Sequence, residues 1–147
     1  MRVAAPAPAP APAGAGPFQP SDRATLKDAV DKCINLDNTL QNCHICTDDT
    51  STITARSDDS ECDASHISDW DTSLVTDMNR IFENLRSHTA DVSRWDVSQV
   101  TDFENMFYRS DAWNGDLSGW DVSKGTKFAA MFYGSKFDQD ISGWDVS

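Results

Sequence analysis

The sequence is poor in basic residues. Its 147 residues include 12 Lys and Arg against 24 Asp and Glu, which gives a formal net charge of −12. Nucleic-acid-binding proteins need Lys and Arg to neutralise phosphates, and an anionic bilayer repels an acidic chain. No segment approaches the ~18 consecutive apolar residues of a membrane helix. The composition therefore predicts an acidic, soluble protein with no nucleic-acid partner and no transmembrane segment.

Motifs for catalysis and targeting are lacking too. Neither G-x-S-x-G, H-E-x-x-H nor a phosphate-binding glycine loop occurs, and His44, His66 and His88 are scattered. The chain has no N-x-S/T site for glycosylation, and the segment 1–17 lacks the apolar core of a secretory signal. We expect a protein that is not an enzyme.

Three zones differ in composition. Residues 1–17 alternate Ala and Pro, which favours an extended tail or linker. Residues 18–66 hold every cysteine, and Ser21 precedes apolar residues at helical spacing, beginning with Leu26. This zone is predicted to be a helical N-terminal capping segment. Residues 67–147 are repetitive.

The cysteines favour two disulfides in an extracytosolic protein, with three pairings that the sequence cannot distinguish. The alternatives are a zinc site, for which the second C-x-x-C of a strong signature is missing, and free thiols. The candidates are Cys33, Cys43, Cys46 and Cys62.

The repeat is centred on tryptophan. This residue recurs about every 25 residues, at Trp70, Trp95, Trp120 and Trp144, and each is followed by Asp, then Thr or Val, then Ser. An apolar residue lies three positions before each Trp, as in the strand of a leucine-rich repeat. These residues are Ile67, Val92, Leu117 and Ile141.

The second half of each unit has apolar residues at i, i+3 and i+4, which predicts a short helix around Phe82, Phe107 and Phe132. We therefore expect an α/β fold, a leucine-rich-repeat-like right-handed solenoid of ~25-residue strand–helix units. Its core would comprise the Trp residues, the apolar residues before them and these three Phe. The units should bury one another, and because Ser147 precedes the next expected helix, we expect a longer array.

The blocks Trp-Asp-Val-Ser and Val100-Thr-Asp-Phe-Glu-Asn-Met-Phe107 occur together at one period. In this, residues 67–147 closely resemble the BspA-like leucine-rich repeats, which are found in mycoplasma surface lipoproteins and in protist and algal proteins. Gly125 and Lys127 depart from the pattern where Val and Asp are expected. The resemblance implies a solenoid for adhesion or protein binding outside the cytosol, and it supplies no catalytic residues.

A row of aspartates follows the tryptophans and should project from one strand face. The row could form an acidic ribbon for a basic partner or for calcium, or each Asp could accept hydrogen bonds from its own backbone. We expect the binding surface to combine it with a serine row and two cations. The predicted surface residues are Asp71, Asp96, Asp121, Asp145, Ser68, Ser93, Ser118, Ser142, Arg94 and Lys124.

We predict a non-catalytic protein-binding or adhesion module of a secreted or cell-surface protein, with no obligatory cofactor. One alternative is a structural subunit of a large complex, with other subunits contacting the Ala/Pro tail and the strand face. An oxidising organelle lumen, such as the thylakoid lumen of an alga, fits that alternative. A calcium-dependent binding module is the third hypothesis.

Overall fold

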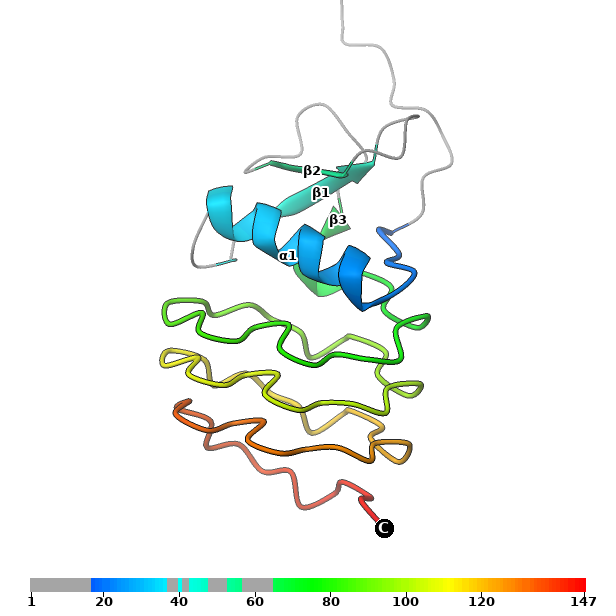
Figure 1. Ribbon diagram of the computed structural model, residues 1–147, viewed down its shortest axis with the longest axis vertical. Helices are drawn as coiled ribbons and strands as arrows, with labels where there is room; N and C mark the ends of the chain where they lie inside the picture. The colour runs from blue at the N-terminus through cyan, green and yellow to red at the C-terminus, as the bar shows by residue number, and fades with distance from the viewer. Residues whose placement is uncertain (1–16, 37–39, 41–42, 48–52, 57–64) are drawn as a thin grey trace, which may run out of the picture.

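The computed structural model describes residues 17–36, 40, 43–47, 53–56 and 65–147. A helix and a small sheet lie at one end, and a stack of loops forms the rest of the described chain (Figure 1). We define loop 1 as residues 67–91, loop 2 as 92–116 and loop 3 as 117–140, and residues 141–147 follow loop 3. The loops lie one below another, with the helix over loop 1 (Figure 1).

The helix α1 (Arg23–Leu36) has a capping residue and an apolar stripe. Asp22 accepts a hydrogen bond from the Thr25 backbone N–H at 2.8 Å, which satisfies a donor that the first turn leaves free. Because Asp22 is the cap, the helix begins two residues after the predicted start at Ser21. Its buried residues follow helical spacing: Leu26, Ala29, Val30 and Cys33.

A small antiparallel sheet lies beside α1. It comprises β1 (His44–Thr47), β2 (Ile53–Arg56) and β3 (Ser65–His66) in the order β2-β1-β3. The prediction of a purely helical cap was therefore incomplete. Strands of two to four residues are too short to show the alternating apolar pattern by which a sequence reveals a strand.

The amino-terminal segment is bound directly to loop 1. The Phe18 ring packs edge-on against Trp70 with 5.1 Å between centroids, and the Asp71 N–H donates to the Phe18 carbonyl at 2.9 Å. From α1, the Arg23 Nε donates to the Asn79 carbonyl at 2.6 Å. Apolar packing and polar contacts thus fix the helix on the stack.

The predicted fold class is wrong. Residues 70–147 contain neither an α-helix nor a β-strand, so they do not form an α/β solenoid of strand–helix units. Loop 1 begins with the 3₁₀ turn η1 (Ile67–Asp69), and the segments predicted as helices are runs of turns. The ladder between loops is limited to the isolated parallel bridges Asp77–Asp102 and Asp102–Lys127.

Backbone N–H groups in these turns find partners in two alternating ways. In loop 1, three amides close turns on the carbonyl three residues earlier, each at 3.4 Å: those of Ile81, Glu83 and Leu85. The alternate amides of the same segment donate to backbone carbonyls of loop 2 at 2.7 to 3.1 Å. The four bonds are Met78 to Asp102, Arg80 to Glu104, Phe82 to Met106 and Asn84 to Tyr108. Since buried backbone donors require partners, each loop depends on the next.

Left-handed backbone prevents these segments from being helical. Two positions per loop have φ between 52° and 72°, whereas an α-helix needs negative φ throughout. They are Arg80, Asn84, Asn105, Arg109, Ala130 and Gly134. Asn and Gly adopt this conformation readily. At Arg80 and Arg109 the residue's own N–H donates to the next loop, which holds it in this conformation.

Aromatic rings stacked from loop to loop fill the interior. Phe82 lies 5.3 Å from Phe107, and Phe107 lies 5.8 Å from Phe132, centroid to centroid. Trp70 stacks on Trp95 at 6.0 Å. Of the residues predicted for the core, those from loops 1 and 2 and the start of loop 3 are buried: Ile67, Trp70, Phe82, Val92, Trp95, Phe107, Leu117 and Trp120. Phe132, Ile141 and Trp144 are only partly buried.

The repeated tryptophans also carry a polar bond. The indole Nε1 of Trp95 donates to the Ile67 carbonyl at 2.8 Å, one loop earlier. The later tryptophans repeat this contact: Trp120 donates to Val92 and Trp144 to Leu117, each at 3.1 Å. Leucine cannot make this bond, which gives a physical reason for Trp at this position.

His88 interrupts the aromatic interior with a polar ring. It is fully buried and stacks on Phe82 at 5.0 Å and near Trp113 at 6.3 Å. Neither ring nitrogen has a hydrogen-bond partner in the described part of the chain. Burial lowers the pKa of His88 to about 4, so the ring is neutral at pH 7.

Replacing Trp120 by Phe should destabilise the stack. The change removes one of the two hydrogen bonds that the Val92 carbonyl accepts, the other coming from the Trp95 N–H, and it shrinks a buried ring. We expect a loss of roughly 2–3 kcal/mol in the free energy of unfolding. Trp144→Phe removes the same type of bond at a half-buried site, where water can substitute, and should cost less than half as much. Denaturant unfolding followed by circular dichroism measures both, and equal losses would contradict this account.

His88→Phe should remove a pH-dependent loss of stability. Unfolded His88 takes up a proton near its ordinary pKa of about 6.5, whereas the folded ring resists protonation down to about 4. The stability that depends on a neutral ring is therefore complete above pH 6.5 and is lost as the pH falls toward 4. The loss is on the order of 3 kcal/mol.

The measurement is the melting temperature of the parent and of the His88→Phe variant from pH 7.5 to 4. The equivalent positions in loops 2 and 3 carry Trp113 and Phe137, so the fold accommodates an aromatic ring there. We expect the variant to be more stable at pH 7 and to change less between pH 6.5 and 5, above the range in which carboxylates titrate. Parallel curves would show that His88 is not the cause.

Candidate functional site

The predicted aspartate row is a column of side chain-closed turns. In each, an Asp Oδ1 accepts a hydrogen bond from the backbone N–H of the Ser two residues later, as Asp side chains do in turns. The pairs are Asp71 with Ser73 at 3.1 Å, Asp96 with Ser98 at 3.0 Å, Asp121 with Ser123 at 3.1 Å and Asp145 with Ser147 at 3.0 Å. The predicted strand setting is wrong, but these carboxylates do accept from their own backbone, which was one of the two alternatives.

A second aspartate column, missed from the sequence, accompanies the predicted serine row. Ser93, Ser118 and Ser142 donate their backbone N–H groups to the Asp two residues earlier, at 2.9 to 3.0 Å. These partners are Asp91, Asp116 and Asp140. The signal for them was present, because D-x-S recurs here at the same period as after each Trp.

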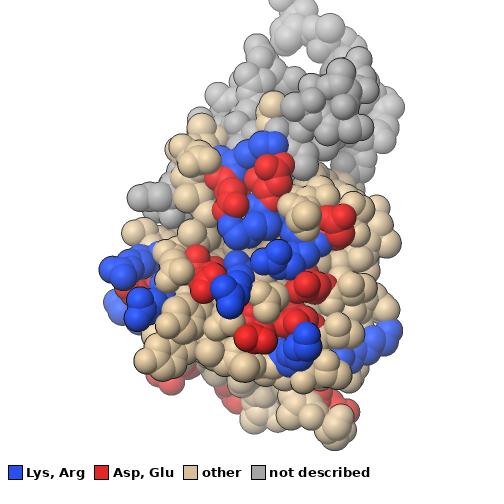
Figure 2. Space-filling view, viewed as in Figure 1, with Lys and Arg blue, Asp and Glu red and all other residues tan. Residues whose placement is uncertain are grey.

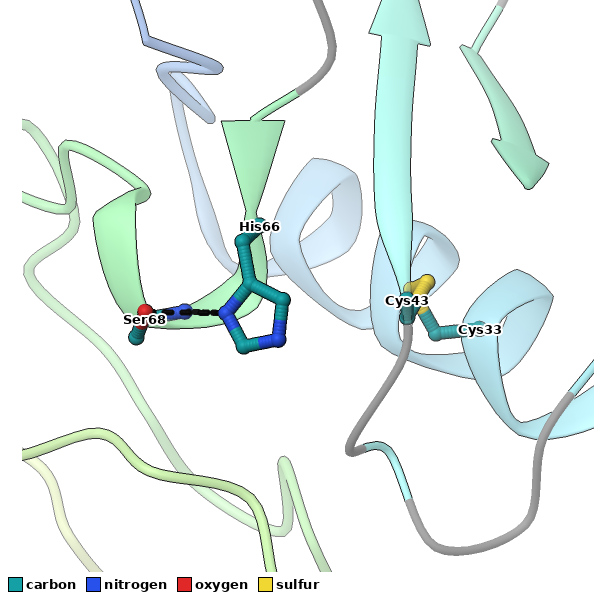
Figure 3. The surroundings of a disulfide bond; sticks show 4 residues. All are labelled: Cys33, Cys43, His66 and Ser68. Atoms are coloured by element: carbon teal, nitrogen blue, oxygen red, sulfur yellow. Dashed lines mark hydrogen bonds between the residues drawn. A yellow bond between two sulfur atoms is a disulfide. The ribbon is translucent and has the colours of Figure 1, made fainter. Parts of the chain in front are cut away.

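Before Ser68, the first serine of the row, His66 takes the place of the second column's Asp. His66 Nδ1 accepts from the Ser68 N–H at 3.3 Å and lies 2.8 Å from the Ser68 Oγ (Figure 3). Ser68 is almost fully buried, whereas Ser93 is half-buried and Ser118 and Ser142 are exposed. The later serines of the row are therefore accessible to solvent, whereas Ser68 is not.

The two predicted surface cations are engaged across loops. The Arg94 Nη2 lies 2.5 Å from Asp69 Oδ1 and donates to Ser68 Oγ at 2.9 Å. The Lys124 Nζ donates to Gln99 Oε1 at 2.6 Å. Both side chains remain exposed to solvent, at the ends of the turns that carry the aspartates.

Five of the column carboxylates have a lowered pKa. Hydrogen bonds from Ser123 lower the pKa of Asp121, and those from Ser147 lower that of Asp145. In the second column, bonds from the following serines likewise lower the pKa values of Asp91, Asp116 and Asp140. Neighbours within a column act on one another, because Asp145 opposes ionisation of Asp121 and Asp91 opposes that of Asp116. The serine bonds outweigh this repulsion.

On the face viewed in Figure 2, Lys and Arg are interspersed among Asp and Glu. Ion pairs outside the two columns join α1 internally and link neighbouring loops. The Lys127 Nζ lies 2.8 Å from Asp102 Oδ2, and Arg86 Nε lies 3.7 Å from Asp111 Oδ2. Although burial opposes ionisation of Asp102, the hydrogen bond from Lys127 lowers its pKa, and Asp102 raises that of Lys127.

One predicted disulfide is present. Cys33 near the end of α1 is bonded to Cys43 just before β1, with 5.4 Å between their Cα atoms, and both residues are buried (Figure 3). These two sulfurs are therefore not available to the alternative zinc site. The Cys46 side chain and Cys62 lie outside the described residues.

Neither a metal centre nor a membrane helix emerges from the described residues. Within them, no three His, Cys, Asp or Glu residues are grouped so that they could hold a metal ion. No helix in that part of the chain is long and apolar enough to cross a bilayer.

The stacked loops and their D-x-S turns define an acidic repeat protein in which each unit of the tryptophan repeat makes one layer. Residues 48–147 match the model of a family described as "Mycoplasma protein of unknown function, DUF285". The match covers more than half of the chain, so the chain belongs to this family. No curated protein and no solved structure matches it.

Replacing Asp121 by Ala should destabilise the turn that Ser123 closes, whereas Asp121→Asn should not. The Asn side-chain oxygen can accept the same backbone hydrogen bond, but Ala cannot. We expect the Ala variant to melt a few degrees lower at pH 7 and the Asn variant to melt within a degree of the parent. Thermal unfolding by circular dichroism tests this order. If both variants melted equally far below the parent, the lost charge and not the lost turn bond would be the cause.

Proposed function

We propose that this chain is a non-catalytic protein-binding module of an extracytosolic protein, with repeats of the BspA-like type, and that its two aspartate columns contact a basic partner. Membership of the family supports the repeat type, since BspA-like repeat proteins belong to it. The observation that carries the proposal is the exposed, evenly repeated set of carboxylates. Asp96, Asp121 and Asp145 are exposed, and each is fixed by a turn bond.

Fixed carboxylates favour binding in two ways. Their side chains are already ordered by the serine bonds, so association costs less conformational entropy than for free side chains. Their pKa values are lowered where Ser123 and Ser147 bond them, so the charges persist well below neutral pH. A column of like charges also steers a basic protein toward this surface and speeds its association.

The disulfide supports an extracytosolic location. Bonds such as Cys33–Cys43 form and persist in oxidising compartments and are rare in the cytosol. The surface and secreted settings of the BspA-like type are compatible with this bond.

The other two hypotheses have less support. A structural subunit, in a thylakoid lumen or elsewhere, would contact other subunits through the Ala/Pro tail, and residues 1–16 lie outside the described residues. A calcium-dependent module would need grouped oxygen ligands. Among the described residues, no three His, Cys, Asp or Glu are grouped so that they could hold a metal ion. Both remain predictions.

A charge-matched pair of triple variants tests the proposal. One carries Asp96→Asn, Asp121→Asn and Asp145→Asn, which keeps the turn bonds and removes three column charges. The control carries Glu83→Gln, Glu104→Gln and Asp111→Asn, which removes three charges outside the columns. Binding to an immobilised ten-residue Lys/Arg peptide is measured by biolayer interferometry over a salt series.

The column variant should bind about tenfold more weakly and show a shallower salt dependence, because it has lost the contacting charges. The control should stay within twofold of the parent. Equal weakening of both variants would mean that the peptide senses only net charge, and the columns would then not be the binding surface.

A further inference from the structure

Loop 2 contains an asparagine that is followed by glycine, the pair Asn114-Gly115. The side-chain carbonyl carbon of an asparagine, Cγ, can be attacked by the backbone nitrogen of the next residue, which closes a succinimide ring. A side chain on that next residue hinders the attack, and glycine has none. The other six asparagines of the sequence all precede larger residues. The pair in loop 2 is therefore the one at which ring closure meets the least steric hindrance.

The attacking nitrogen is not held by a hydrogen bond. Within the described chain, no acceptor receives the Gly115 N–H. The nitrogens that follow the three other asparagines of the loops are all engaged as donors, at 3.1 to 3.4 Å: Arg80 to Glu104, Leu85 to Phe82 and Met106 to Phe103. Each of these amides must break its bond before it can attack, which protects the asparagine that precedes it.

The carbonyl under attack is held by the next loop. The Asp138 N–H of loop 3 donates to Asn114 Oδ1 at 2.8 Å. Negative charge develops on this oxygen as the nitrogen adds to Cγ, and a backbone donor that already points at the oxygen stabilises that charge. Asn114 and Asp138 are both exposed, so water reaches the site.

Packing requires the glycine of this pair. A Cβ at position 115 would lie 2.7 Å from Cζ2 of Trp113, which is fully buried. A residue with a side chain would therefore displace a ring of the aromatic interior. Because Asn114 also supplies the acceptor that joins loop 2 to loop 3, both members of the pair belong to the contact between these layers.

We propose that Asn114 is a site of spontaneous covalent modification in the folded chain, which converts it to aspartate and isoaspartate. The bond between Gly115 N and Asn114 Cγ forms, the Cγ–Nδ2 bond breaks, and the proton of the attacking nitrogen leaves with the amide as ammonia. Water then opens the ring. Its hydroxyl adds at Cγ to give aspartate, or at the main-chain carbonyl carbon of Asn114 to give isoaspartate, and its other proton returns to the ring nitrogen.

Both products place a new carboxylate where loop 2 meets loop 3. Position 114 is equivalent to Asp138 one layer on, so two like charges then lie in neighbouring layers. Aspartate keeps an oxygen that can accept the Asp138 N–H. Isoaspartate adds a methylene to the backbone next to the buried Trp113 and should loosen the contact between the two loops. The modification does not depend on whether the aspartate columns bind a partner.

The test follows the full chain at pH 8 in water enriched in oxygen-18, with peptide mass spectrometry at intervals over several weeks. Each converted site takes one oxygen from the solvent, so new aspartate and isoaspartate are distinguished from the aspartates of the sequence. The internal references are Asn79, Asn84 and Asn105. A synthetic peptide of residues 111–118, treated in the same way, gives the rate without the fold.

Asn114 in the folded chain should convert at least about tenfold faster than each of the three reference asparagines, and within about tenfold of its rate in the peptide. Conversion in the peptide with Asn114 unchanged in the folded chain would overturn the proposal, because the fold would then protect the site. Equal conversion of Asn114 and the three references would also overturn it, because the free Gly115 N–H and the bond from Asp138 would then confer no reactivity.

Discussion

The alternation of backbone amides between turn and neighbouring loop is the constraint on which this structure depends. In the turn segments of loops 1 and 2, every second N–H bonds within its own loop, and the others bond to carbonyls one layer away, as Phe82 does to Met106. Because half of the donors have no local partner, a single loop cannot satisfy its own backbone. The aromatic stacks and the tryptophan indoles then fill and cross-link layers whose spacing the backbone has already set.

Much of the layer arrangement could be predicted from the sequence, but not its secondary structure. The tryptophan period gave the layer length, because a stack of similar layers must repeat its largest buried ring. The apolar spacing around Phe82 and Phe107 could not separate a helix from consecutive turns, since both return side chains to one side after three or four residues. Left-handed backbone decides between them, and at Arg80, Arg109 and Ala130 no residue type signals it.

Only part of the candidate site could be predicted from the sequence. The Asp row after each Trp was visible as a pattern, but its role in closing turns depends on a serine two residues on, which is a short-range signal. The same signal marks Asp91, Asp116 and Asp140, and it was missed because histidine replaces the first member at His66. The disulfide pairing of Cys33 with Cys43 required the helix end and β1 to be brought together, which spacing alone does not show.

The central claim is that Phe82 and Phe107 bond to the next loop and not to a helical turn of their own. NMR scalar couplings across hydrogen bonds test this directly, because they identify the donor nitrogen and the acceptor carbonyl of each bond. The account predicts couplings from the Phe82 nitrogen to the Met106 carbonyl carbon and from Phe107 to Met131. Couplings from these nitrogens to the carbonyls four residues earlier, those of Met78 and Phe103, would contradict it and would restore a helix.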